Sequence, residues 1–199
     1  MNLIEVAEKA CNDWWNTYTD RTTTKGKLRK TRGEFAQENL RTALTMFKAV
    51  VDANLDSQFL YDFPRKCGYG ILGGNDGIKT GLRSVNLSRG EKSVKDHVFG
   101  ATLAGEEVLK AFKEWDYDID YMVNEWLPKN LYYFAIIELT KEEHNILDTH
   151  KHTKNQKRNL EHYANLGIEL EYNGYAFKNT PSRVIPKQEV VTQFFNFEK

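Results

Sequence analysis

The sequence predicts an α+β fold in which a β-β-α unit is embedded among helices. Two observations predict this class. Apolar residues recur at helical spacing across 31–55 and 102–115, the pattern of helices that bury one face. β-prone runs lie between and after these stretches, and the clearest is NLYYFAIIEL at 130–139. A chain of 199 residues is long enough for one domain with a substantial core.

The N-terminal part is predicted to be helical. A short helix to about Thr19 would place four residues on one face, namely Ile4, Ala7, Cys11 and Trp15. Thr31-Arg32-Gly33-Glu34 fits a capping box, in which the hydroxyl and the carboxylate bind free backbone N–H groups at a helix start. A long helix should follow, with a buried face made by Phe35, Leu40, Leu44, Phe47, Val51 and Leu55.

The Gly-rich stretch at 64–81 is predicted to be an irregular surface loop. Its segment GGNDGIKT superficially resembles a phosphate-binding loop. Ile78 interrupts the Gly-Lys step that such a loop needs to place its lysine and backbone amides around a phosphate. The pattern therefore favours an ordinary loop.

The second half supplies the β-β-α unit. A hairpin is predicted over 82–98 with its turn at 89–91, and a helix follows over 102–115. A buried strand is expected at 131–139, and Thr140 to Glu143 form a second capping box that starts a helix running to about Leu166. Asn173-Gly174 predicts a last hairpin turn. These elements divide the chain into an N-terminal helical region (1–63), a central core (64–166) and a C-terminal hairpin and tail (167–199).

Composition excludes several classes of protein. The 28 basic and 28 acidic side chains cancel, which argues against a protein that coats nucleic acid through bulk charge but allows a local basic surface. Two cysteines without CxxC spacing exclude a Cys-rich zinc ribbon and a disulfide scaffold. The N-terminus does not fit a signal peptide, and no run approaches the roughly 20 apolar residues that cross a bilayer. We therefore expect a cytoplasmic protein without a membrane partner.

Acid, imidazole and amide side chains fall at the junctions of the β-β-α unit. Asp96 and His97 end the predicted hairpin, Asn130 precedes the next strand, and His144 lies in the first turn of the helix. An oxygen of Asp96 and a nitrogen of His144 can hold a divalent cation and leave positions for phosphate oxygens and water. His97 would point to the other side of an extended chain, free to deprotonate a water. The Asn130 amide could orient an imidazole.

KDHVFG at 95–100 and NLYYFAIIELTKEEHNIL at 130–147 together resemble the HNH nuclease family, the ββα-metal endonucleases. The resemblance implies a ββα-metal finger with an inserted helix, because His97 and Asn130 are far apart in the sequence. It implies that Asp96 and His144 are metal ligands, that His97 is the general base and that Asn130 is the orienting amide. The implied activity is cleavage of DNA with Mg²⁺ or Mn²⁺, leaving 5′-phosphate and 3′-hydroxyl ends.

Basic residues near this unit are candidate phosphate contacts, which position DNA without reading its sequence. They are Lys95, a helical group of Lys151, His152, Lys154, Lys157 and Arg158, and an N-terminal group of Lys27, Arg29 and Lys30. His144, Asp148 and His152 share one helix face, so the last two could extend the metal shell or contact phosphate. Basic helix surfaces are also often simply solvated. A homodimer would let one site per chain cut both strands symmetrically.

Three alternatives stay open from the residues alone. Asp96-His97 could be a solvated turn at a strand end. The neutral charge and the aromatic segment WDYDIDYMVNEW at 115–126 fit a non-enzymatic protein-binding factor of a virus or mobile element. A carboxylate-based nuclease of the PD-(D/E)xK type would need an acid followed by E-x-K on a strand, and no convincing example occurs.

Overall fold

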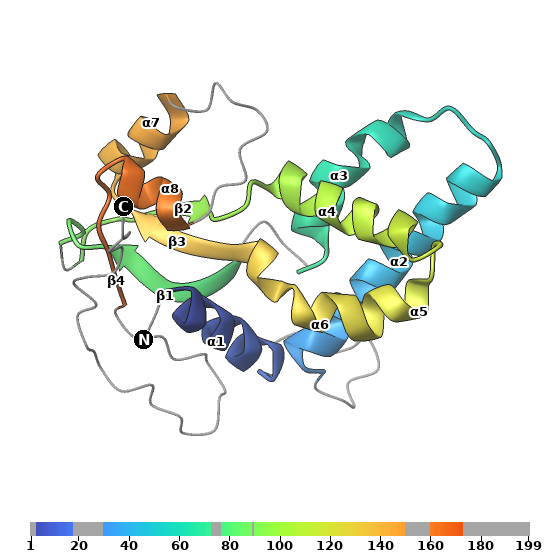
Figure 1. The fold of residues 1–199 in the computed structure, drawn as a ribbon, viewed down its shortest axis with the longest axis horizontal. Helices are drawn as coiled ribbons and strands as arrows, with labels where there is room; N and C mark the ends of the chain where they lie inside the picture. Colours follow the sequence, from blue (N-terminus) through green and yellow to red (C-terminus); the bar gives the residue numbers. More distant parts are fainter. Residues whose placement is uncertain (1–2, 18–29, 73–76, 89, 150–159, 173–199) are drawn as a thin grey trace, which may run out of the picture.

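A computed structural model describes residues 3–17, 30–72, 77–88, 90–149 and 160–172 (Figure 1). It confirms a mixed α+β fold. The first half contains α1 (Leu3–Trp15), α2 (Arg32–Asp52), α3 (Gln58–Gly70), β1 (Ile78–Ser84) and β2 (Val94–His97). The second half contains α4 (Ala101–Glu114), α5 (Ile119–Tyr121), the π-helix η1 (Met122–Trp126), α6 (Leu127–Lys129), the 3₁₀ helix η2 (Leu131–Phe134), β3 (Ala135–Leu139), α7 (Lys141–Thr149), α8 (Leu160–Asn165) and β4 (Leu170–Tyr172).

The four strands form one sheet in the order β2-β3-β1-β4, so β3 lies between the two strands that precede it. β3 runs parallel to β1 and antiparallel to β2, and β4 runs antiparallel to β1. The predicted hairpin over 82–98 is therefore wrong, because β1 and β2 are not neighbours. β3 is almost wholly buried, which suits a central position, whereas β2 carries an exposed lysine and lies at the edge of the sheet.

The Gly-rich stretch begins as a helix rather than as the predicted loop, since α3 continues through Gly70. Gly68 of α3 and Gly105 of α4 allow these two helices to pack closely. A Cβ on Gly68 would lie 2.1 Å from the carbonyl oxygen of Ala101, and one on Gly105 would lie 1.7 Å from that of Pro64. The two helices approach backbone to backbone, side by side in Figure 1. Local composition predicted a loop because it carries no information about this contact.

Both predicted capping boxes are present. The Thr31 hydroxyl accepts from the Glu34 N–H, and the Glu34 carboxylate accepts from the Thr31 N–H. Two predicted extents need correction. Residues 131–134 form the 3₁₀ helix η2, so the strand begins only at Ala135. Leu55 is 57% exposed because α2 ends at Asp52, before the predicted buried face is complete.

One hydrophobic core cluster draws on every part of the described chain. It joins Val6 of α1, Leu40 of α2, Phe112 of α4, Ile137 of β3 and Leu170 of β4. The predicted division after residue 63 falls inside α3. The predicted turn at 173–174 lies outside the described residues. Among the described helices, none combines the length and the apolar character needed to cross a membrane.

Candidate metal centre

Asp96 is a buried carboxylate on the edge strand β2. Its side chain is 4% exposed, and its register partner in β3 is Ile137. Residues directly opposite in an antiparallel pair share a face of the sheet, so Asp96 lies on the face of Ile137. On this face the hydroxyl of Tyr163, from α8, donates to Asp96 Oδ2 at 2.5 Å. The burial of a carboxylate is expensive unless donors or cations satisfy it, and the tyrosine is one such donor.

His144 reaches the same place from α7, which a capping box starts immediately after β3. The Thr140 N–H donates to Glu143 at 3.0 Å, and the Glu143 N–H donates to the Thr140 hydroxyl at 3.1 Å. Glu143 also accepts hydrogen bonds from Ser84 at 2.7 Å and Asn86 at 2.9 Å. These bonds tie the first turn of α7 to the end of β1, so the helix that carries His144 has a fixed origin.

Glu143 is a buried acid whose pKa reflects two opposing effects. Burial raises the pKa, but the hydrogen bonds from Ser84, Asn86 and Thr140 favour the charged form and together outweigh burial. The pKa of Glu143 is therefore held below its ordinary value. Glu143, the residue next to His144, is therefore charged and stabilises the start of α7. The predicted capping box implies the same structural role.

Asp96 and His144 face each other across the junction between β2 and α7. His144 Nε2 lies 3.6 Å from Asp96 Oδ1. The other ring nitrogen, Nδ1, lies 3.5 Å from Asp148 Oδ2, one helical turn further on. Both separations exceed the usual hydrogen-bond range. Because they approach different ring nitrogens, Asp96 and Asp148 lie on different sides of the imidazole.

These distances are compatible with a shared cation. Two ligand atoms that each lie about 2.1 Å from one metal ion are about 3.0 Å apart at a right angle and about 4.2 Å apart when opposite. The 3.6 Å separation of Asp96 and His144 falls within that interval. Among the described residues, no group of three or more histidine, cysteine, aspartate or glutamate side chains is arranged to hold a metal. The pair would thus supply two ligands, and water or substrate oxygens would supply the others.

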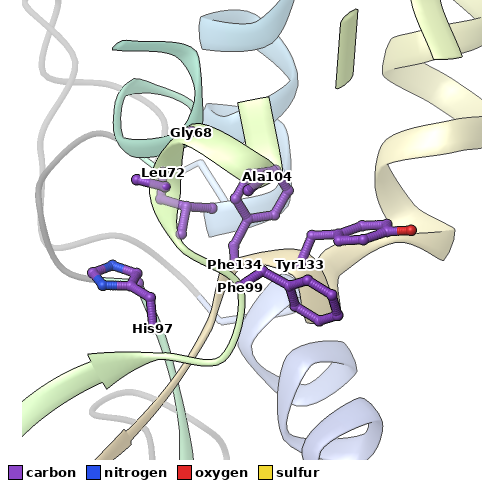
Figure 2. A pocket seen from close by; sticks show the side chains of 9 residues that line it. Gly68, Leu72, His97, Phe99, Ala104, Tyr133 and Phe134 are labelled. Carbon is purple, nitrogen blue, oxygen red and sulfur yellow. The ribbon is translucent and has the colours of Figure 1, made fainter. Parts of the chain in front are cut away.

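The structure does not bring His97 to this pair. His97 is the register partner of Ile136, one residue along β3 from the partner of Asp96, so it lies on the other face of the sheet. A Cβ on Gly77 would meet Ile136 at 2.5 Å and the His97 ring at 3.4 Å, which places the three together. There His97 lines a small pocket, across from the rings of Phe99 and Tyr133 (Figure 2).

Asn130 has a local role in the structure. It follows α6, and its side-chain amide donates to the Trp126 carbonyl oxygen at 2.7 Å. This bond satisfies an acceptor near a helix end, where carbonyl groups lack partners within the helix. Its predicted role in orienting an imidazole stays a prediction.

Most of the predicted phosphate contacts lie outside the described residues. These are Lys27, Arg29, Lys151, His152, Lys154, Lys157 and Arg158. Lys95 is exposed on β2, one residue before Asp96. Lys30 forms an ion pair with Glu38, so its charge is already partly compensated within the protein.

Sequence reasoning missed Tyr163 altogether. It lies 67 residues after Asp96, and within its helix it looks like any core aromatic residue. Only the fold shows that its hydroxyl meets the candidate ligand. Comparisons of the chain with family models, with curated proteins and with solved structures found no match.

Proposed function

We propose that this protein is a metal-dependent endonuclease in which Asp96 and His144 hold a divalent cation, Mg²⁺ or Mn²⁺. The observation that supports the proposal most is the approach of these two side chains to 3.6 Å. The sequence alone predicts the same two residues as a ligand pair. They come from an antiparallel strand pair, β2 and β3, and from the helix that follows it. This order is the one that a ββα-metal finger requires, with 98–134 inserted between its strands.

Three side chains of the protein would take part in binding the cation and the DNA. Asp96 Oδ1 and His144 Nε2 would bind the cation, and the exposed Lys95 would contact a phosphate of the DNA backbone. When bound, a divalent cation in such a site polarises a phosphoryl oxygen and lowers the pKa of a bound water. The products implied by the resemblance are 5′-phosphate and 3′-hydroxyl ends.

His97 lies on the other face of the sheet from the proposed metal centre. As the general base it would have to reach the substrate beside Asp96, whereas its ring lies on the opposite face of β2, in the pocket of Figure 2. We therefore leave His97 out of the proposed metal centre. Its role in proton transfer stays a prediction.

Plasmid cleavage tests the proposal. Purified protein should nick or cut supercoiled plasmid with Mg²⁺ or Mn²⁺ and stop when EDTA is added. Asp96→Asn and His144→Ala should each lower cleavage strongly and weaken Mn²⁺ binding, because the first replaces a charged oxygen ligand with a neutral amide and the second removes a nitrogen ligand. Asp56→Asn makes the same chemical change at an exposed position of the α2–α3 connection and should behave as wild type. Full cleavage by Asp96→Asn would contradict the proposal.

The alternative of a non-enzymatic protein-binding factor has less support. In the segment 115–126, Tyr117 packs edge-on against Phe112, with ring centroids 5.2 Å apart. Tyr121 stacks on Trp115 at 3.8 Å, and Trp126 stacks on Tyr133 at 6.1 Å. Trp115 is 49% exposed, so it could anchor a partner. The other rings are used in packing. A stoichiometric protein complex without Mn²⁺ binding would favour this alternative.

A further inference from the structure

Tyr163 is a fully buried tyrosine whose hydroxyl contacts one of the two candidate metal ligands. Its side chain is 0% exposed, and its hydroxyl donates to Asp96 Oδ2 at 2.5 Å. The other carboxylate oxygen, Oδ1, is the one that faces His144 Nε2. The two oxygens of Asp96 therefore have different neighbours, a phenol on one and an imidazole on the other.

A hydrogen bond of this kind fixes the orientation of a carboxylate. O–H···O⁻ bonds of about 2.5–2.7 Å are charge-assisted and roughly twice as strong as neutral ones. The bond to Tyr163 therefore restrains the torsion angle about the Cβ–Cγ bond of Asp96. With Oδ2 bound to Tyr163, Oδ1 is kept toward His144, where a cation would bind.

We propose that Tyr163 is a positioning residue for Asp96, which holds Oδ1 of this carboxylate in place for a divalent cation. This inference rests on the proposed function and deepens it. Groups that hydrogen-bond to metal ligands orient them, and their loss typically costs 10–100-fold in metal affinity or activity. Phenylalanine would fill the same space as the tyrosine ring, so the substitution Tyr163→Phe removes only the hydroxyl group.

The test is Mn²⁺ binding, measured by calorimetry on the full chain, for wild type, Asp96→Asn, Tyr163→Phe and Tyr117→Phe. Tyr163→Phe should raise the Kd for Mn²⁺ about 10–100-fold. Tyr117→Phe should leave it unchanged, because that partly buried ring packs against Phe112, and neither residue is part of the candidate centre. Circular dichroism and the melting temperature report the fold separately.

The outcomes separate this inference from the proposed function. Wild-type protein that binds no Mn²⁺ would overturn both. Wild type and Tyr163→Phe that bind Mn²⁺ equally, while Asp96→Asn does not, would overturn the role of Tyr163 and leave the metal centre intact. A lower melting temperature with an unchanged Kd would likewise assign Tyr163 to the core alone.

A second measurement covers the case in which Tyr163→Phe does not fold. 3-Fluorotyrosine at position 163 keeps the ring and the hydroxyl and gives a ¹⁹F NMR signal. Addition of Mg²⁺ should shift this signal, because the cation withdraws charge from the carboxylate that the phenol contacts. Fluorotyrosine at position 117 should give no shift. An unmoved signal at 163 under conditions where Mn²⁺ binds would refute the proposal.

Discussion

Asp96 and His97 are neighbours in sequence with unrelated surroundings. Strand alternation sends the carboxylate to the side of His144 and Tyr163, and the imidazole to the pocket beside Gly77. In β2 this alternation places the two side chains on opposite faces of the sheet. This separation makes the two residues independently testable.

His97→Ala should leave the affinity for Mn²⁺ unchanged, because the ring lies on the face of β2 away from Asp96. Calorimetry checks this directly, with His144→Ala as the variant that should lose binding. The plasmid assay then decides the role of His97 in proton transfer, since loss of a general base typically lowers a rate by 10²–10⁴-fold. Weakened Mn²⁺ binding by His97→Ala would place its ring in the metal centre after all.

Glu143 should make the stability of the protein pH-dependent. Its pKa in the folded state lies below the ordinary value of 4.5, so the unfolded chain binds the proton more tightly. The resulting stabilisation is complete above about pH 4.5 and is lost as the pH falls through the lower folded-state pKa. Glu143→Gln should remove this component from the free energy of unfolding, measured by urea denaturation between pH 3 and pH 7.

Glu142→Gln is the matched control for that measurement. Glu142 precedes Glu143 in α7 and is exposed, so the change should leave the pH profile of stability almost as in wild type. Identical profiles for Glu143→Gln and wild type would show that the bonds from Ser84, Asn86 and Thr140 do not favour the charged form.

At the scale of elements, the approach of α3 to α4 depends on two glycines. Gly105→Ala would place a methyl group 1.7 Å from the Pro64 carbonyl oxygen, and backbone cannot yield as a flexible side chain can. We expect a loss of about 3 kcal/mol or more in unfolding free energy, at the upper end of overpacking costs. Gly70→Ala, at the end of α3, meets nothing within 4 Å and should change stability by less than about 0.5 kcal/mol. Equal stability of the two variants would contradict this packing.

What could be predicted from the sequence depended on the range of the interaction. The capping boxes at Thr31 and Thr140 are bonds between residues three apart, and both were predicted correctly. The pairing of β3 with β1 joins Ile78 to Ala135, a long-range choice that no local pattern specifies. The same limit applies to the candidate site. The residue types and their order in the sequence predict Asp96 and His144, whereas the contact of Tyr163 with Asp96 is known only from the structure.

At the scale of the whole molecule, the two cysteines belong to the same hydrophobic core. Cys11 of α1 and Cys67 of α3 are both buried. Burial, with a smaller effect of Glu8, raises the pKa of Cys11 to about 12, and burial raises that of Cys67 to about 12. Thiolates are the reactive form, so both residues should resist a disulfide reagent at pH 8 in the native protein.

Because both thiols belong to one hydrophobic cluster, they should become reactive together as denaturant is added. Labelling rates of the single variants Cys11→Ser and Cys67→Ser, followed against urea concentration, give this comparison. The unfolded chain, in which both thiols react rapidly, is the reference. Exposure of Cys11 at clearly lower urea than Cys67 would mean that the N-terminal helical region opens as a separate unit.

The place of β3 between β1 and β2 also determines when the fold can form during synthesis. The ribosome releases β1 and β2 first, and both must wait for residues 135–139 before either has this neighbour. Such long-range pairing slows folding and leaves strand edges exposed in the meantime. The contacts of Asp96 form later still, because His144 and Tyr163 are synthesised after β3. An unfinished chain that stops at residue 139 therefore contains Asp96 but lacks both His144 and Tyr163.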